Sequence, residues 1–394
     1  MGIMGTSEIL KADLEEFRRL LLQGCTTSTT YYSSKNNPAC QEFEKLPNRE
    51  IRDMRRDEML DDHEIDEKLV CVTSGISFLG LAIVNRLLDY GYTVRILIEN
   101  QDDLEKLREI EEFDEIRNND SNSNASDSRS SNSDSFGRVR NWGVVMAKLN
   151  EVESLCDAFQ GCCGVFHTSA FADPAGISGY SKSMADLEVK ASQNVMEACS
   201  KTASVRKCVF TSSLLACVWR DNNLNDLPQL LDHSCWSDES VCREKKLWLA
   251  LGKTMAEKAA WKKAEHSDVK LATICPGFIT GPELCRRNPT SSIAYLKGAQ
   301  EMYAVGTLAS SDVSKVAEAH VRVYEAMGKI GGRGRYICFD HVIDSEEQVV
   351  KLTTQMGIPA NRITSNARNT DSVSRFRLSN RKLSRLMSRR SICC

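Results

Sequence analysis

The segment from residue 69 to residue 99 constrains the fold more than any other part of the chain. LVCVTSG (69–75) is a short apolar run rich in β-forming residues, and it ends at a turn signal. FLGLAIVNRLLDYG (78–91) has the apolar periodicity of a helix that Gly91 would end, and YTVRILIE (92–99) is a second apolar strand. This order of strand, turn, helix and strand predicts a βαβ unit with parallel strands.

The same alternation continues along the chain. Four further apolar runs follow, and a helical stretch precedes each of the last two. These four runs have the length and composition of buried strands: WGVVMAKL (142–149), GVFHTSA (164–170), KCVFTSS (207–213) and LATICPG (271–277). The pattern predicts an α/β protein with a doubly wound, Rossmann-type parallel sheet.

The composition excludes several classes of protein. The chain has 394 residues, with 51 Lys and Arg against 54 Asp and Glu, so its net charge is −3 and we expect no nucleic-acid partner. No apolar run reaches the roughly 18 residues of a membrane-spanning helix, and the N-terminus lacks the basic start and apolar core of a secretory signal. The 16 Cys are scattered, and no Cys or His spacing predicts a metal site. We therefore expect reduced thiols in a cytoplasmic protein.

Two segments differ in composition from the predicted sheet. Residues 1–67 contain a stretch, 10–21, with apolar residues at helical spacing, followed by polar and charge-dense sequence. We expect residues 1–67 to be an N-terminal extension that is mostly flexible. Its helix either packs on the main body or frays in solvent, and the alternative is that it offers a surface to a protein partner or a membrane. Residues 117–135 are nearly all Ser, Asn and Asp, a composition that predicts a disordered surface insertion.

Both ends of the chain carry short matches to lipid-attachment motifs. Met1-Gly2 begins a minimal N-myristoylation pattern, and the tail 388–394 ends in Cys393-Cys394 behind basic residues. Motifs this short often match by chance, so we do not expect membrane anchoring.

The turn after the first predicted strand is a weak dinucleotide-binding motif. Three glycines in such a turn allow the tight bend, the approach of the pyrophosphate and the close packing of the helix. By spacing, the three positions hold Ser74, Ser77 and Gly80, with an additional Gly75. Since only the packing glycine is present, the location of the turn between a strand and a helix is the stronger indication.

Glu99 ends the second predicted strand, where an acid accepts hydrogen bonds from ribose hydroxyls and repels a 2′-phosphate. This favours NAD over NADP locally, although Arg95 and Lys106 are near enough in sequence to weaken the preference. The alternative is that Glu99 is an ordinary solvated acid at a strand end.

A series of sequence blocks follows the first βαβ unit in a recognisable order. The blocks are GCCGVFHTSAFADP, RKCVFTSS, HSCWSDESVCREKK, GKTMAEKAAWKKA, PGFITGP, AEAHVRVYE, GRYIC and FRLSNRKL. Over about residues 68–387 the chain resembles the plant cinnamoyl-CoA reductase and dihydroflavonol reductase family of extended short-chain dehydrogenases. The resemblance implies one Rossmann-type reductase domain with a small C-terminal substrate lobe, mainly from residues 276–387.

The family consists of NADPH-dependent reductases that act on hydroxycinnamoyl-CoA thioesters or flavonoid ketones, and a Ser, a Tyr and a Lys carry the chemistry. The resemblance implies Ser213 for the Ser and Lys253 for the Lys. The Tyr position, four residues before the Lys, holds Leu249, which cannot donate a proton. A water held by Ser213 and Lys253 is the hypothetical substitute.

Positions that match the family also imply a cofactor-binding set. Its members come from the first turn, the ends of strands and the helix that carries the Lys: Ser74, Gly75, Ser77, Phe78, Leu79, Gly80, Glu99, Lys106, Lys148, Leu149, Thr168, Ser169, Lys253, Pro276 and Phe278. Besides Leu249 and the serines of the first turn, three further positions depart from the family pattern, because Lys148 and Lys315 replace Asp and Glu99 replaces a basic residue.

Two functions of different classes follow. One is an NAD(P)-dependent oxidoreductase that transfers a hydride to a small aromatic substrate, an acyl-CoA thioester or carbonyl of phenylpropanoid-type metabolism. The other is a non-catalytic relative whose fold senses a nucleotide or binds proteins as a regulatory module. The resemblance favours the first, whereas Leu249 and the serines of the first turn favour the second.

Three other residues have simpler interpretations. His167 lies on a predicted strand beside the cleft, and we expect it to be structural. Cys235 and Cys242 are seven residues apart in the substrate-side block. We expect reduced thiols there, with a redox-sensitive pair as the alternative.

Overall fold

The computed structural model describes residues 68–108, 141–169, 180–220, 230–282, 289–328, 332–364 and 376–388. The expected N-terminal extension, the expected insertion at 117–135 and the lipid-motif matches at both chain ends lie outside these ranges.

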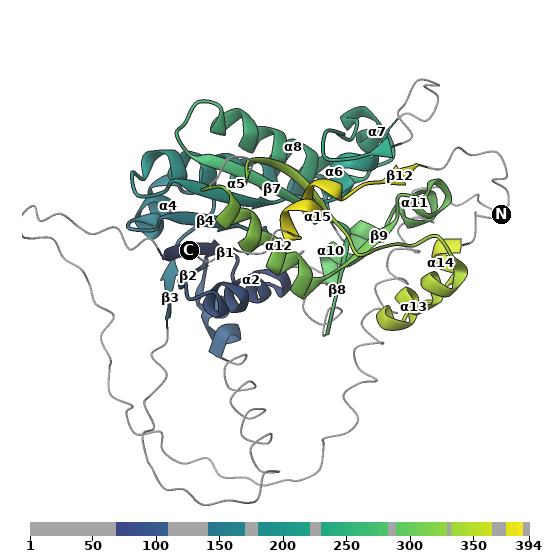
Figure 1. Cartoon of the computed structure of the whole chain (residues 1–394), viewed down its shortest axis with the longest axis horizontal. Helices are drawn as coiled ribbons and strands as arrows, with labels where there is room; N and C mark the ends of the chain where they lie inside the picture. The colour runs from purple at the N-terminus through teal and green to yellow at the C-terminus, as the bar shows by residue number, and fades with distance from the viewer. Residues whose placement is uncertain are drawn as a thin grey trace, which may run out of the picture.

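A seven-stranded sheet forms the centre of the fold, in the order β10-β7-β5-β4-β1-β2-β3 (Figure 1). All neighbouring strands in it are parallel. The chain order reverses between β1 and β4, as in a doubly wound sheet, so the predicted α/β fold is confirmed. The strands are β1 (Leu69–Thr73), β2 (Thr93–Ile98), β3 (Trp142–Met146), β4 (Gly164–His167), β5 (Lys207–Thr211), β7 (Lys270–Pro276) and β10 (Gly334–Cys338).

All six strands predicted from the apolar runs are present, and each ends one to three residues earlier than predicted. GVFHTSA leaves the sheet after His167, and KCVFTSS leaves it after Thr211. The Thr and Ser residues that follow have short polar side chains, which suit a loop at the mouth of a sheet. The seventh strand, β10, was not predicted as a strand and pairs with β7.

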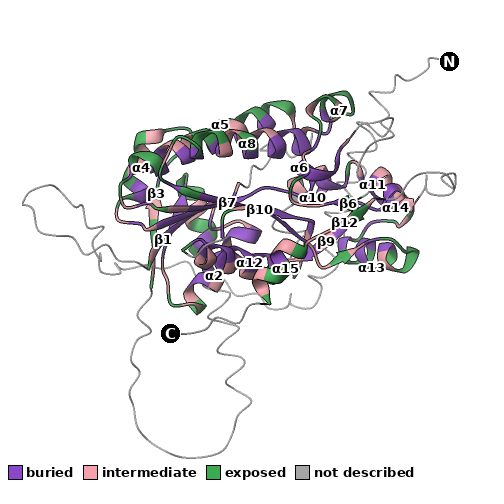
Figure 2. Ribbon diagram, turned by 45° about the horizontal axis from the view of Figure 1, so that its top comes forward, coloured by how far each residue is buried: buried purple, intermediate pink, exposed green. Residues whose placement is uncertain are grey.

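Helices cover both faces of the sheet, with α4, α5 and α8 on one side and α2, α12 and α15 on the other (Figure 2). Each layer buries its own hydrophobic cluster, which includes Phe159 and Phe210 on the first side and Ile83 and Tyr336 on the second. No helix in the described ranges is long and apolar enough to cross a membrane. These six helices are α2 (Phe78–Asp89), α4 (Val152–Phe159), α5 (Lys182–Lys201), α8 (Trp248–Ala264), α12 (Val313–Ala326) and α15 (Arg381–Met387).

Smaller elements gather beyond the carboxyl end of β7 (Figure 1). There β9 pairs parallel with β8 and antiparallel with β11, while β6 pairs with β12. The remaining elements are α6 (Leu215–Val218), β6 (Leu230–Leu231), α7 (Glu239–Glu244), β8 (Phe278–Thr280), α10 (Pro289–Leu296), α11 (Ala299–Val305), β9 (Ala309–Asp312), β11 (His341–Val342), α13 (Glu346–Met356), α14 (Asn361–Thr364) and β12 (Arg377–Leu378).

Candidate functional site

The turn between β1 and α2 depends on two glycines and two serines. A Cβ on Gly75 would lie 2.8 Å from Ile96 Cγ2, and one on Gly80 would lie 2.2 Å from the Ser74 carbonyl oxygen. Ser74 itself has φ of 47°, in the left-handed region that favours glycine. Ser77 caps α2, because its Oγ accepts a hydrogen bond from the Gly80 N–H at 3.1 Å. The turn therefore has the close strand–helix packing of a dinucleotide site.

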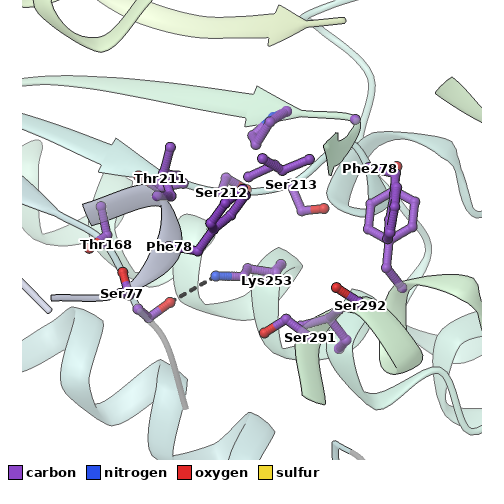
Figure 3. A pocket seen from close by; sticks show the side chains of 17 residues that line it. Ser77, Phe78, Thr168, Thr211, Ser212, Ser213, Lys253, Phe278, Ser291 and Ser292 are labelled. Atoms are coloured by element: carbon purple, nitrogen blue, oxygen red, sulfur yellow. Dashed lines mark hydrogen bonds between the residues drawn. The ribbon is translucent and has the colours of Figure 1, made fainter. Parts of the chain in front are cut away.

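A pocket opens beside this turn, at the carboxyl ends of β4, β5 and β7 (Figure 3). It holds about 680 Å³ of empty space, part of it open to solvent. In open α/β sheets, ligands bind at this edge, where the strand order reverses. The lining residues are Ser77, Phe78, Leu79, Thr168, Ser169, Thr211, Ser212, Ser213, Leu249, Lys253, Pro276, Gly277, Phe278, Ile279, Ser291, Ser292 and Tyr295.

The pocket brings together much of the site that the resemblance implies. The turn residues Ser74, Gly75 and Gly80 stand behind it, and four others, described below, do not line it. The predicted residues that line it are Ser77, Phe78, Leu79, Thr168, Ser169, Ser213, Lys253, Pro276 and Phe278.

A buried ion pair holds the Lys253 ammonium. Lys253 Nζ lies 2.5 Å from Glu188 Oε1 and donates a hydrogen bond to Ser169 Oγ at 2.8 Å. Ser169 Oγ in turn donates to Glu188 Oε1 at 2.5 Å, and the Tyr180 hydroxyl donates to Glu188 Oε2. The Lys253 side chain is 11% exposed and that of Glu188 is 1% exposed. The lysine therefore reaches the pocket with its counter-ion directly behind it.

The pKa values of the neighbouring groups follow from this arrangement. Burial alone would raise the pKa of Glu188, but the Lys253 charge and the hydrogen bonds from Lys253, Ser169 and Tyr180 hold that pKa below its ordinary value. Burial, with the Glu188 charge adding to it, raises the pKa of Tyr180 well above its ordinary value. Glu188 is therefore ionised and Tyr180 keeps its proton at neutral pH.

Ser213 and Leu249 complete the part of the pocket around Lys253. Ser213 Oγ accepts a hydrogen bond from the Leu215 N–H at 3.2 Å, so its position is fixed at the end of β5. Figure 3 shows Ser213 and Lys253 facing the same space. Leu249 is 5% exposed and lines this space four residues before Lys253 on α8. The pocket thus has an ammonium and a hydroxyl, and an alkyl group at position 249.

A second buried ion pair supports the wall of the pocket. Arg335 Nε lies 2.7 Å from Glu257 Oε1, and its guanidinium stacks on the Trp236 ring at 3.5 Å from the centroid. Ser212 Oγ and Thr273 Oγ1 each donate to the Glu257 carboxylate at 2.6 Å. These contacts join β5, β7, β10, α8 and the 230s loop behind Ser213.

Four predicted cofactor residues lie away from the pocket. Glu99 follows β2 and is exposed, and partial burial of its carboxylate raises its pKa. Lys106 Nζ is 3.3 Å from Asp103 Oδ1, and Lys148 Nζ is 3.2 Å from Glu151 Oε1. The fourth residue, Leu149, is buried at 4% exposure.

The sequence reasoning missed Glu188 and Tyr180. A signal for Glu188 was nevertheless present, because the apolar positions of 181–201 place an acid on the stripe that helix α5 buries. Ala185, Ala191 and Ser192 share that stripe. A buried acid needs a partner, so this position could have been marked as one half of a buried ion pair, although the sequence does not say which cation it meets.

His167 and the cysteines lie outside the pocket lining. His167 is fully buried, and its Nδ1 lies 2.9 Å from Thr73 Oγ1, which joins β4 to β1. Cys235 and Cys242 are buried and form no disulfide. Within the described ranges no three His, Cys, Asp or Glu residues form a metal-binding group.

The fold and the pocket define a reductase-type Rossmann protein, and comparison with known proteins identifies its family. Residues 71–329 match the model of the 3-beta hydroxysteroid dehydrogenase/isomerase family. Cinnamoyl-CoA reductase 1 of Petunia hybrida is 33% identical over 304 residues, which span 75% of this chain and 80% of that protein. Tetraketide alpha-pyrone reductase 1 of Arabidopsis thaliana is 31% identical over 292 residues, 73% of this chain and 80% of that protein. The chain belongs to the cinnamoyl-CoA reductase-like branch of the extended short-chain dehydrogenases, as the sequence blocks predicted.

Solved structures show the same fold. Vestitone reductase from alfalfa superposes with a TM-score of 0.52 at 24% identity, and it covers 81% of this chain and 91% of that one. A yeast methylglyoxal/isovaleraldehyde reductase complexed with NADPH gives a TM-score of 0.57 at 19% identity, over 82% of this chain and 93% of that one.

Proposed function

We propose that the chain is an NAD(P)-dependent reductase of an aromatic acyl-CoA thioester or related carbonyl compound, with NADH as the preferred cofactor. The observation that carries the proposal is that Lys253 and Ser213 line one pocket at the switch point of the sheet. The curated relatives, among them cinnamoyl-CoA reductases, support the reaction class. Phe78, Phe278 and Tyr295 give the pocket aromatic walls that suit an aromatic substrate.

The residues present suit a nicotinamide dinucleotide. The N-terminus of α2 reaches the pocket through Ser77 and Phe78, and a helix N-terminus attracts a pyrophosphate. Lys253 would hold ribose hydroxyls, and Thr168 and Pro276 would contact the nicotinamide end. When bound, the reduced cofactor supplies the hydride that adds to the carbonyl carbon.

The chain's own residues would then act on the carbonyl oxygen. The Ser213 hydroxyl donates a hydrogen bond to this oxygen and orients it. A water held between Ser213 and Lys253 supplies the proton that Leu249 cannot. Because this water is not held as firmly as a side chain, we expect slow turnover.

Leu249 and the Lys253–Glu188 pair favour a second function, a non-catalytic module that binds a nucleotide in this pocket. In this reading residues 68–387 form the binding unit, and residues 1–67 recruit a protein partner. In either reading we propose a cytoplasmic location, which a fluorescent fusion would test. Activity of the purified chain on a thioester separates the two functions.

The first experiment is a calorimetric titration of the full chain with NADH and, separately, NADPH. We expect NADH to bind more tightly, because the Glu99 carboxylate repels a 2′-phosphate. Glu99→Gln should reduce the ratio of the NADPH and NADH dissociation constants by about fivefold, which is the effect of one exposed charge pair in water. Glu105→Gln removes another exposed acid nearby and should change nothing. Absence of binding by both cofactors at millimolar concentration would overturn the proposal.

A further inference from the structure

The residues of the pocket lining that the structure describes include a single charged side chain. Among the described residues that surround it, Lys253 is the only cation and there is no acid. The other lining groups are hydroxyls, such as those of Ser213 and Ser292, and apolar or aromatic side chains. Among the aromatic ones, Phe278 packs edge to face against Tyr295, with 5.4 Å between the ring centroids. A free ammonium in such surroundings would attract a carboxylate strongly, because charges interact more strongly in a partly dry pocket than in water.

Glu188 changes this expectation because it lies directly behind the ammonium. Its Oε1 lies 2.5 Å from Lys253 Nζ and accepts a hydrogen bond from Ser169, while its Oε2 accepts one from Tyr180. Three donors therefore hold the carboxylate, and at 1% exposure it is screened by water and salt much less than a surface charge. The positive charge of Lys253 and the negative charge of Glu188 are in direct contact, so the pair has no net charge.

We propose that Glu188 is a specificity-determining residue that cancels the Lys253 charge, so that the pocket accepts an uncharged carbonyl or hydroxyl group and excludes a carboxylate. This inference rests on the proposed function, because it names the class of ligand that the same pocket takes. Lys253 can still donate hydrogen bonds to a neutral oxygen, for which the pair's net charge is unimportant. A carboxylate gains the attraction of the lysine but meets the repulsion of Glu188 beside it.

The selection has a chemical consequence for a thioester reductase. Hydrolysis of an aromatic thioester gives an acid with the same ring as the substrate, and this acid would compete for a pocket with a free ammonium. Hydride addition to the thioester carbonyl, followed by cleavage of the C–S bond and departure of the CoA thiolate, instead gives an aldehyde with no charge at the reacting end. A pocket of zero net charge distinguishes the uncharged acyl end of the thioester and the uncharged aldehyde from the carboxylate of the acid.

The test is a binding measurement with two probes that share a ring and a chain, cinnamate and cinnamyl alcohol. Both are titrated calorimetrically at neutral pH into the full chain and into Glu188→Gln, which keeps the size of the side chain and removes its charge. We expect Glu188→Gln to raise the affinity for cinnamate by about tenfold or more relative to that for the alcohol. Glu197→Gln is the matched control, because Glu197 lies on the same helix at the surface, paired with Lys201 and Lys263.

Each result decides between the claims. An unchanged ratio of affinities in Glu188→Gln, with the alcohol still bound, overturns the inference and leaves the proposed function in place. Failure of the alcohol to bind the unmodified chain overturns the proposed function and the inference with it. If Glu188→Gln does not fold, the double variant Glu188→Gln/Lys253→Met, which is also neutral, should show the ratio of the unmodified chain. A loss of cinnamate binding of about tenfold in the double variant would show that Lys253 acts as a free cation, against the inference.

Discussion

Leu249 and Lys253 lie one helical turn apart on α8 and line the same pocket. Residues four positions apart on a helix share a face, so a side chain at 249 faces the space beside the ammonium. A general acid for the carbonyl oxygen would have to stand in this space. Position 249 is therefore the place on α8 where a side chain that donates a proton would have to stand.

We expect Leu249→Tyr to raise the rate of thioester reduction by about 10- to 100-fold, which is at or below the lower limit of the roughly 10²–10⁴-fold that a positioned general acid typically contributes. The gain is limited because Glu188 cancels the Lys253 charge that would help the phenol release its proton. Steady-state loss of reduced cofactor measures the rate. Leu249→Phe is the control, because it fills the same volume without a hydroxyl. An equal increase in the Phe variant would mean that pocket shape, and not proton donation, limits the reaction.

A second prediction concerns the turn between β1 and α2. We expect Gly80→Ala to lower the free energy of unfolding by about 3 kcal/mol, as overpacking against backbone does. The added Cβ would lie 2.2 Å from the Ser74 carbonyl oxygen, which cannot move without shifting the turn. Gly143→Ala is the control, since its Cβ would have no neighbour within 4 Å. Urea unfolding measures both, and equal stabilities of the two variants would contradict the packing argument.

Much of the fold was readable from the sequence because the sheet is buried on both faces. Buried parallel strands are short apolar runs, and these identified six of the seven strands of the sheet. The strand β10 was missed because GRYIC is short and begins with a glycine and a buried arginine. Its Arg335 is neutralised by Glu257, a contact between residues 78 apart that no local pattern reveals.

The candidate site was predictable where it follows strand ends and not where it depends on packing between helices. Thr168, Ser169 and Ser213 follow β4 and β5, so their place at the pocket could be inferred from the order of the strands. The partner of Lys253 could not, because Glu188 reaches it from α5 across a helix–helix contact. Single-sequence patterns fix which face of a helix is buried, but not the neighbour that this face meets.

The pair of Arg335 and Glu257 leads to a third prediction. Their side chains are 7% and 0% exposed, so removal of one charge leaves the other buried without its partner. We expect Arg335→Met to lower the free energy of unfolding by about 3–5 kcal/mol, and Arg335→Met/Glu257→Leu to regain most of it. Arg243→Met, at an exposed pair with Glu239 of 3.6 Å, should cost less than about 1 kcal/mol. Chemical denaturation compares the variants, and a loss in Arg335→Met no larger than in Arg243→Met would contradict the role of burial.

The last prediction is a pH dependence of stability that arises from His167. Burial, reinforced by the Lys253 charge, lowers the pKa of His167 to about 3, so the ring is neutral in the folded protein. Below about pH 6.5 the unfolded chain takes up a proton that the folded one does not. The neutral His167 therefore contributes fully to the free energy of unfolding above the unfolded-state pKa of the ring. As the pH drops from about 6 to about 4, the free energy of unfolding falls by about 1 kcal/mol per pH unit. The buried His320, whose pKa burial lowers to about 4, adds to the same slope. In urea unfolding at several pH values, His167→Asn should therefore reduce the slope without removing it, while His266→Asn, at an exposed histidine, should keep it. Identical slopes in all three proteins would exclude His167 as the source.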